Sequence, residues 1–190
     1  MKKFTLFSLV LIFSISIVSA QFTKIGGGPG FTSGYYFHDA KYDYNKSGNI
    51  FVSAKGIYEI SLPLHISPSV TFFIPHVYKF MDEKTTVNTM MVDINGHYVF
   101  NSLDQFEFYG LAGLDVMLAW KKAKYTSNTF KESDNALGLN LGLGTYMKIT
   151  EQFDLYAEAK YLLSKYSQFM LNAGILINID WLSKNEETGL

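Results

Sequence analysis

Between Ala136 and Ile179, apolar residues alternate with polar or small residues almost without interruption. In the first part of this stretch Leu137, Leu139, Leu141 and Leu143 are separated by single Gly or Asn residues. The alternation resumes over 153–164 and again over 169–179. A period of two over segments of about ten residues is typical of strands with one face in lipid and the other in a barrel lumen. The chain is therefore expected to form strands with two chemically different faces.

The start of the chain has the pattern of an export signal. Two lysines precede a mostly apolar stretch over 4–18, and Val18-Ser19-Ala20 supplies the small residues of a cleavage site. We expect a secretory signal peptide over 1–20, cleaved between Ala20 and Gln21. A retained membrane anchor is the less favoured alternative, because the apolar stretch is short for a membrane span. Gln21 is not a cysteine, which argues against a lipid-anchored precursor.

The segment after the signal, 21–190, has the length of one domain. It contains no apolar run long enough for a transmembrane helix. Only helices and closed barrels satisfy the backbone hydrogen bonds in lipid, so a membrane location requires a closed barrel. The aromatic content of 16% fits rings placed at both membrane interfaces. Export and strand pattern together predict a location in a bacterial outer membrane.

The composition argues against several other functions. The chain has no Cys and no Arg, and without the signal peptide 14 lysines face 17 acidic residues. No basic block exists, so we expect no nucleic-acid partner. The histidines His38, His65, His76 and His97 lack metal-ligand spacing. The glycine-rich stretch 26–30 lacks the Lys-Ser/Thr of a phosphate loop, so no metal or cofactor is expected.

The alternation predicts an all-β fold, an eight-stranded antiparallel up-and-down transmembrane β-barrel with a filled polar lumen, over 21–181. A polar tail follows over 182–190. The expected strands are 23–35, 49–62, 69–80, 88–100, 106–123, 136–149, 153–164 and 169–180. The expected short turns are 63–68, 101–105 and 150–152, and the expected longer outer loops are 36–48, 81–87 and 124–135. Short turns on one side and longer loops on the other are typical of bacterial barrels.

A three-residue turn at 150–152 fixes the register of one hairpin. It places Met147 opposite Leu155 and Lys148 opposite Asp154, with a glycine opposite each long charged side chain farther along. The glycines are expected to leave these side chains room. In the hairpin around 101–105 the same reasoning pairs Phe100 with Phe106, Tyr98 with Phe108 and Ile94 with Ala112.

One parity of every strand faces inward in this prediction and carries charges of both signs. The lumen of an eight-stranded barrel is just wide enough for side chains to fill it. Isolated buried charges are costly, so these charges are expected to pair and to close the lumen as a structural network. The inward set is Lys24, Lys55, Glu59, Lys79, Asp93, Glu107, Asp115, Lys121, Lys148, Asp154, Glu158 and Lys160.

The segment Phe153-Asp-Leu-Tyr-Ala-Glu-Ala-Lys-Tyr161, after the turn Ile149-Thr-Glu-Gln152, resembles the penultimate strand of small outer-membrane barrels. The segment Asn172-Ala-Gly-Ile-Leu-Ile-Asn-Ile179 resembles their final strand. The chain is thus similar to the OmpX/OmpA-like barrels of Gram-negative bacteria, the outer membrane protein beta-barrel domain type. The resemblance implies an integral outer-membrane protein whose partners are outer-membrane lipid and the barrel-assembly machinery. Trp181 is nearest to the terminal aromatic residue with which such barrels often end.

Three residue groups allow other interpretations. His38 lies in an expected outer loop with Asp39, Asp43 and Ser47, the residue types of an acyl-chain enzyme, although a triad is recognised by geometry. Glu158 and Lys160 have the types of an acid/base pair, but paired charges in a lumen are more often structural. The tyrosines of the expected loop region, Tyr35, Tyr36, Tyr42, Tyr44, Tyr125 and Tyr166, fit an outer aromatic girdle.

The function that the sequence favours is non-enzymatic, with a structural or surface-interaction role through the outer loops and an unspecified surface partner. A lipid-modifying enzyme with a site at the outer rim is the first alternative. A narrow channel or small-ligand carrier is the second. A soluble lipocalin-like barrel is disfavoured, because its apolar face would have to point inward.

Overall fold

A computed structural model describes residues 22–33, 48–80, 83–124 and 129–179. The expected signal peptide with its Ala20–Gln21 cleavage site and the tail 182–190 lie outside the described residues. Within the described residues there are nine strands: β1 (Lys24–Thr32), β2 (Asn49–Ser61), β3 (Leu64–Phe73), β4 (His76–Phe80), β5 (Glu83–Leu103), β6 (Phe106–Lys124), β7 (Thr129–Lys148), β8 (Phe153–Ser164) and β9 (Gln168–Asn178).

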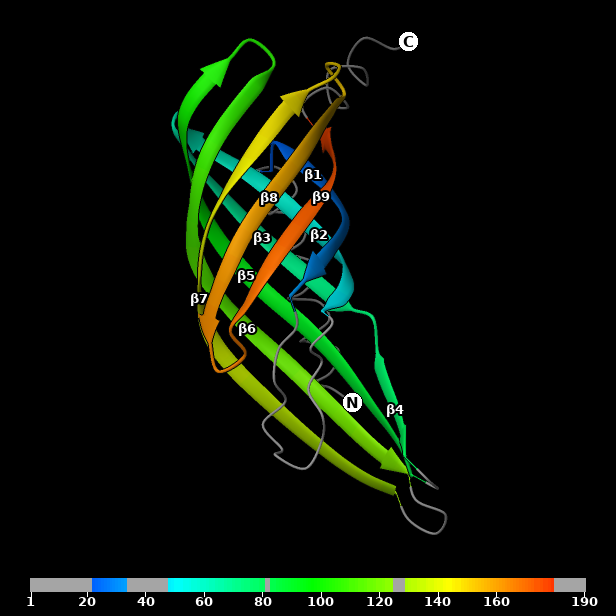
Figure 1. Cartoon of the computed structure of the whole chain (residues 1–190). Helices are drawn as coiled ribbons and strands as arrows, with labels where there is room; N and C mark the ends of the chain where they lie inside the picture. The colour runs from blue at the N-terminus through cyan, green and yellow to red at the C-terminus, as the bar shows by residue number, and fades with distance from the viewer. Residues whose placement is uncertain (1–21, 34–47, 81–82, 125–128, 180–190) are drawn as a thin grey trace, which may run out of the picture.

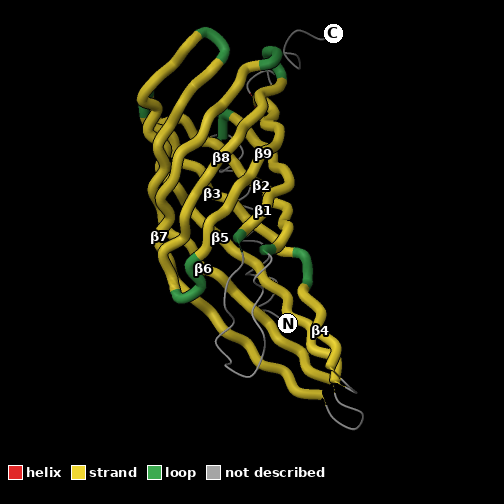
Figure 2. Tube along the Cα trace, viewed as in Figure 1, coloured by secondary structure: helices red, strands yellow, loops and turns green. Residues whose placement is uncertain are grey.

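Eight of these strands close into one antiparallel barrel, as Figures 1 and 2 show. The ring runs β1-β2-β3-β5-β6-β7-β8-β9 and closes where β9 pairs with β1. Strand β4 is an extra strand that pairs only with β5. The predicted eight-stranded antiparallel barrel is therefore confirmed, with one additional short strand.

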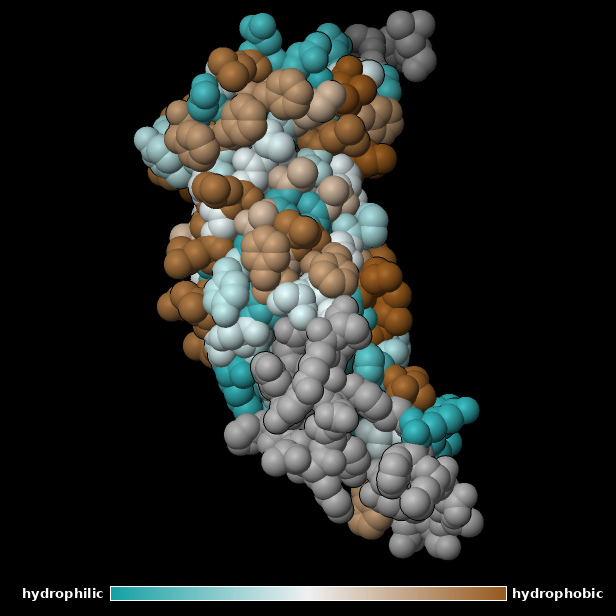
Figure 3. Space-filling model, in the orientation of Figure 1, coloured by the Kyte–Doolittle hydropathy of each residue, from teal (hydrophilic) through white to brown (hydrophobic). Residues whose placement is uncertain are grey.

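The barrel wall is apolar outside, and its charged side chains point inward, which is the reverse of a water-soluble domain. On β8 the outward Phe153, Leu155 and Tyr161 are 40–45% exposed, whereas Asp154 and Glu158 are buried. Figure 3 shows hydrophobic side chains over much of the outer surface. Such a surface suits lipid, and the polar face is enclosed by the barrel. No helix in the described part of the chain is long and apolar enough to cross a membrane.

The predicted register of the β7–β8 hairpin is confirmed, with Met147 opposite Leu155 and Lys148 opposite Asp154. The register predicted for the β5–β6 hairpin is wrong. Strand β5 continues to Leu103, and an irregularity between Val99 and Asn101 shifts the pairing. Tyr98 therefore lies opposite Gly110, and Ile94 opposite Leu114. The shift from the predicted pairs is two residues, and an even shift leaves every side chain on its predicted face.

The predicted turn at 63–68 is also wrong, because the turn consists of Leu62 and Pro63 and β3 already begins at Leu64. The strand expected over 69–80 is interrupted at Ile74 and Pro75, where the proline cannot donate to the sheet. The pairing with β5 changes across this break by one residue, from Phe72–Met90 to His76–Val87. A shift by one residue exchanges the two faces, so β4 has the opposite parity to β3.

Strands β5, β6 and β7 contain 21, 19 and 20 residues, and β1, β8 and β9 contain 9, 12 and 11. A membrane needs only about 9–11 residues per strand. The surplus projects beyond the barrel as a four-stranded sheet with β4 (Figure 1). We call this sheet the extension; it comprises β4 and residues 83–88, 119–124 and 129–135. We call the end of the barrel that carries the extension the loop end. The opposite end, where tight turns join the strands, is the turn end.

Two of the expected outer loops are largely strands of the extension. The sequence predicts loops over 81–87 and 124–135, but β5 begins at Glu83 and β7 at Thr129. These stretches are polar at almost every position. Apolar–polar alternation marks a strand with lipid on one face, and the extension lacks that signal because polar residues occupy both of its faces, including the buried Thr85 and Lys121. The expected loop 36–48 lies outside the described residues except for Gly48.

Candidate functional site

Two ion pairs cross the middle of the lumen and link strands that are not neighbours. Lys55 Nζ of β2 lies 2.6 Å from Glu158 of β8, and Lys160 Nζ of β8 lies 3.0 Å from Asp93 of β5. All four side chains are at most 6% exposed. The Tyr109 hydroxyl donates to Glu158 at 3.1 Å. Residues two apart on β8 therefore fasten opposite walls of the barrel to each other.

A second buried carboxylate lies directly beside this centre. Asp115 of β6 pairs in register with Asp93, and both side chains are buried. Neither carboxylate oxygen of Asp115 has a hydrogen-bond partner within the described part of the chain. Like charges directly opposite each other on neighbouring strands are destabilising. The lumenal centre thus contains one carboxylate that the surrounding side chains do not satisfy.

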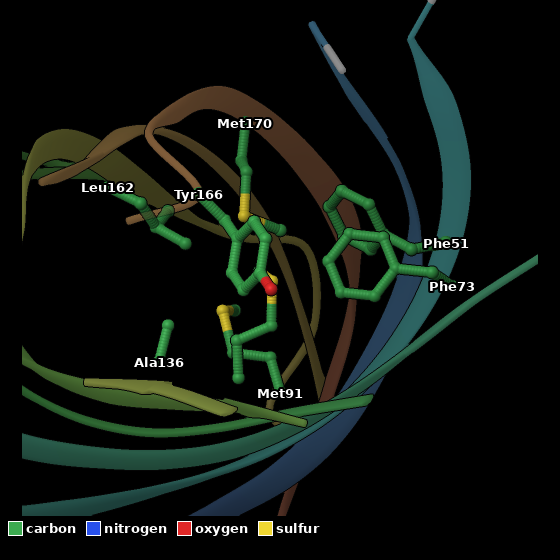
Figure 4. Close-up of a cluster of buried hydrophobic side chains, with 8 residues drawn as sticks. Phe51, Phe73, Met91, Ala136, Leu162, Tyr166 and Met170 are labelled. Atoms are coloured by element: carbon green, nitrogen blue, oxygen red, sulfur yellow. The ribbon is translucent and has the colours of Figure 1, made fainter. Parts of the chain in front are cut away.

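The lumen toward the loop end is filled by apolar side chains instead of charges. The ring of Tyr166 lies among Met91, Leu162 and Met170, as Figure 4 shows. The full cluster is Phe51, Phe73, Met91, Met117, Ala136, Leu162, Tyr166 and Met170. We call this cluster the apolar plug.

Tyr166 corrects the expectation of an outer aromatic girdle at that position. It belongs to the turn between β8 and β9, yet it is 1% exposed and points into the barrel. Its hydroxyl donates to Asp134, which also pairs with Lys165. The other tyrosines of that prediction, Tyr35, Tyr36, Tyr42, Tyr44 and Tyr125, lie outside the described residues.

Aromatic rings and a histidine fill the lumen on the turn-end side of the ion pairs. The ring of His97 stacks on Tyr109 with centroids 4.4 Å apart, and its Nδ1 is 2.6 Å from the Tyr146 hydroxyl. Tyr109 and Tyr146 also stack on each other, at 4.5 Å. His97 lies opposite Leu111 and not opposite Tyr109, the partner that the predicted hairpin register implies. The contact with Tyr109 is therefore a diagonal one.

A polar cavity of about 530 Å³ opens at the turn end. Lys24 bridges Asp154 at 3.0 Å and Glu59 at 3.4 Å within it. Lys148 and Glu107 also line this cavity, which we call the vestibule. The described residues contain no group of three His, Asp or Glu side chains arranged to hold a metal ion.

The structure distributes the twelve expected inward charges over three places. Seven are buried: Lys55, Asp93, Asp115, Asp154, Glu158 and Lys160 inside the barrel, and Lys121 on the extension. Four more, Lys24, Glu59, Glu107 and Lys148, line the vestibule. Lys79 does not face inward, because the break before β4 moves it onto the outward face opposite Lys84.

The space beside the glycines differs from what the sequence suggests. Gly144 and Gly142 do lie opposite Glu158 and Lys160. A Cβ on Gly144, however, would lie 2.3 Å from the ring of Tyr109. This glycine makes room for the tyrosine that donates to Glu158, and not for the carboxylate itself. The apolar plug is missed by reasoning from charge, although the inward parity of its methionines could have indicated it.

The remaining candidate catalytic residues, His38, Asp39, Asp43 and Ser47, lie outside the described residues. Glu158 and Lys160, the possible acid/base pair, are buried at the centre of the lumen and bind different partners. Each is held in a cross-barrel ion pair. The geometry is that of structural ties between strands.

A barrel with a lipid-type exterior and a filled lumen defines the class of small membrane-spanning β-barrels. The family model of the outer membrane protein beta-barrel domain matches residues 5–181. The chain belongs to this family, and its place is the outer membrane. The turn end therefore faces the periplasm and the loop end the exterior. A search of the curated proteins finds no match to this sequence.

Solved structures of similar fold include three outer-membrane barrels. Ail, the attachment invasion locus protein of Yersinia pestis, has a TM-score of 0.54 and 17% identity, over 81% of this chain and 94% of Ail. The N-terminal barrel of OprF from Pseudomonas aeruginosa has a TM-score of 0.55 and 12% identity, over 83% and 98%. A major outer membrane protein of Thermus thermophilus has 0.53 and 12%, over 81% and 98%. These likenesses support the fold.

Proposed function

We propose that this protein is a non-enzymatic outer-membrane barrel that acts at the cell surface through its extension, after export by a cleaved signal peptide. The observation that carries the proposal is the surplus length of β5, β6 and β7 beyond what a membrane requires. This surplus is arranged as a sheet held by regular pairing with β4. An ordered platform outside the membrane suits contact with a surface partner.

The filled lumen supports a closed barrel in preference to a channel. A solute that crosses would have to displace the apolar plug and then separate the two central ion pairs. Breaking a buried ion pair by removing one of its partners costs about 3–5 kcal/mol. In this proposal the lumenal charges are structural, and exchange with the surroundings takes place at the outer surface. Outer-membrane lipid and the barrel-assembly machinery are the partners that such a barrel requires.

Among the structural neighbours, Ail is named an attachment invasion locus protein, and one of its structures contains a heparin analogue. The similarity is one of fold alone. It nevertheless makes attachment a suitable first assay for this chain.

The test uses a deletion strain that carries either the wild-type gene or a variant without the extension. Residues 77–86 and 121–132 are each replaced by an Asn-Gly turn, which joins the directly paired residues His76 with Val87 and Trp120 with Ser133. Folding of both proteins is checked by the different electrophoretic mobility of heated and unheated barrels. Attachment to protein-coated surfaces and resistance to detergent are then measured.

We expect both proteins to restore detergent resistance and only the wild type to restore attachment. Equal attachment with both proteins would refute a role of the extension. Release of acyl chains from added lipid, abolished by His38→Ala, would favour the enzyme. Stable single-channel currents in planar bilayers would favour the channel.

A further inference from the structure

Five lysines lie on one face of the extension. They are Lys79 of β4, Lys84 of β5, Lys122 and Lys124 of β6, and Lys131 of β7. All five are exposed. The register places them on the face that continues the outward wall of the barrel, since Trp120 and Leu137 have the same parity on β6 and β7. We call these five residues the lysine face.

The lysines oppose one another directly across the strands. Lys84 lies opposite both Lys79 and Lys124, and Lys122 lies opposite Lys131. Like charges in such positions destabilise a sheet. Among the side chains that the structure describes, none of the five amines forms an ion pair with a carboxylate.

Carboxylates are available on the same strands, but they belong to the other face. Glu132 pairs with Lys121 at 3.3 Å, and Asp134 pairs with Lys165. The other face of the extension is therefore neutralised internally, whereas the lysine face leaves its charge for an external anion.

The height of the lysine face matches the headgroup layer of the outer leaflet. Trp120 is 44% exposed and ends the apolar outward series of β6. A strand rises about 3.3 Å per residue and is tilted by about 40°, which gives roughly 2.5 Å of height per residue. Lys122 then lies about 5 Å and Lys124 about 10 Å above Trp120. The headgroup layer is roughly 5–8 Å thick on each side of a bilayer, so Lys122 lies within it and the backbone of Lys124 just above it, from where the long lysine side chain can reach back to it.

We propose that the lysine face binds the phosphate groups of outer-leaflet lipids and so holds the extension against the membrane surface. Lysine is a point-charge phosphate ligand, and a chain without arginine has no bidentate alternative. A soluble polyanion also carries negative charge. The position of the lysines directly above the lipid-facing wall favours lipid phosphates as the anion. Lipid binding by the lysine face requires no surface partner. Loss of attachment and loss of lipid retention can therefore be told apart.

The experiment compares lipid retention by the purified, folded, full-length mature barrel. The protein in neutral detergent is mixed with phosphatidic acid and phosphatidylcholine of identical acyl chains, and bound lipid is counted by native mass spectrometry. The test variant is Lys84→Gln/Lys122→Gln/Lys124→Gln. The matched control replaces the same three residues by Arg, and Lys148→Gln removes a charge at the vestibule.

We expect the wild type to retain phosphatidic acid in preference to phosphatidylcholine. Each lysine near an anionic surface contributes roughly fivefold in affinity, so the triple Gln variant should lose at least about tenfold. The Arg variant and Lys148→Gln should keep the preference. Equal retention by the wild type and the triple Gln variant would overturn the proposal.

Two further measurements keep the proposal falsifiable if the Gln variant does not fold. The unfolding temperature of the wild type should be higher in nanodiscs with about 20 mol% phosphatidic acid than in pure phosphatidylcholine, and high salt should remove the difference. No difference would refute the proposal. Binding of a sulfated oligosaccharide by the wild type, without any preference between the two lipids, would overturn it in favour of a soluble polyanion.

Discussion

The ion pair between Lys55 and Glu158 is expected to be a principal tie across the barrel. Its N–O distance is 2.6 Å, and the two side chains are only 4% and 3% exposed. At an effective dielectric constant of about 20, the attraction at this distance is roughly 6 kcal/mol. Much of this value offsets the cost of removing both charges from water. The net effect therefore has to be measured as a coupling energy.

Lys55→Met should lower the free energy of unfolding by about 3–5 kcal/mol, because it leaves a buried carboxylate without its cation. Glu158 would retain the hydroxyl of Tyr109 as a donor, but no compensating charge at the same distance. Glu158→Gln should cost a similar amount, since the buried Lys55 amine would lose its counter-charge and keep a neutral amide and the ring of Tyr156, 4.5 Å from its Nζ. The double variant should cost less than the sum of the single ones.

The assay is reversible urea unfolding of the four proteins in lipid vesicles, followed by tryptophan fluorescence. We expect a coupling energy of at least about 1.5 kcal/mol, the lower range for close charge pairs. The pair Lys121–Glu132 is the control, because Glu132 is 59% exposed and its coupling should stay below about 1 kcal/mol. Additive effects of the Lys55 and Glu158 substitutions would refute the view that this pair ties the walls together.

Three further outcomes are expected. Asp115→Asn should raise the free energy of unfolding by about 1–2 kcal/mol in the same assay, because a buried carboxylate without donors is replaced by a neutral amide; a loss of stability would contradict this. The hydrogen bonds from Lys165 and Tyr166 lower the pKa of Asp134, so their stabilising effect is present above the ordinary carboxyl pKa and is lost as the pH falls through the lowered value. The protection factors of the amides in the 165–167 turn, corrected for the intrinsic pH dependence of hydrogen exchange, should therefore fall in acid, and Lys165→Met should move the fall to higher pH. Leu141→Lys should cost about 2–4 kcal/mol and Leu137→Lys, nearer the loop end, less; equal costs would show that depth in the membrane is misassigned.

The sequence predicts those parts of the fold in which one face of a strand touches lipid. The β7–β8 hairpin is correct residue by residue, because Met147 and Leu155 require lipid while Lys148 and Asp154 avoid it. The β5–β6 hairpin shows the limit of this reasoning. A shift of two residues keeps both faces intact, so alternation alone cannot detect it.

The extension and Lys79 escape prediction for two other physical reasons. Polar residues occupy both faces of the extension at the start of β5 and at the start of β7, so these two stretches look like loops. Lys79 changes face because one residue is gained in the pairing around Pro75. A proline indicates a break in a strand, but not the number of residues by which the pairing slips. Such a slip is fixed by the partner strand, which the local sequence does not contain.

The lumenal charges are predictable from the sequence in part: their inward direction is, but their partners are not. The partners of the central charges join distant strands, as Lys55 with Glu158 and Lys160 with Asp93. The inward parity of each residue is local information, but the choice among the cations within reach depends on the shear of the whole barrel. Asp154 illustrates this point, because its partner in the sheet is Lys148 while its ion pair is with Lys24.

The order of the layers in the lumen bears directly on function. An apolar plug at the loop end keeps water from the central ion pairs, which strengthens their attraction and raises the cost of separating them. A rigid and closed barrel is then a suitable base for strands that project beyond it. Motion of the extension would otherwise be transmitted along β5, β6 and β7, which are continuous from the extension to the turn end. The charges inside the barrel and the sheet outside it are therefore parts of one arrangement, in which a stiff core presents a surface to the exterior.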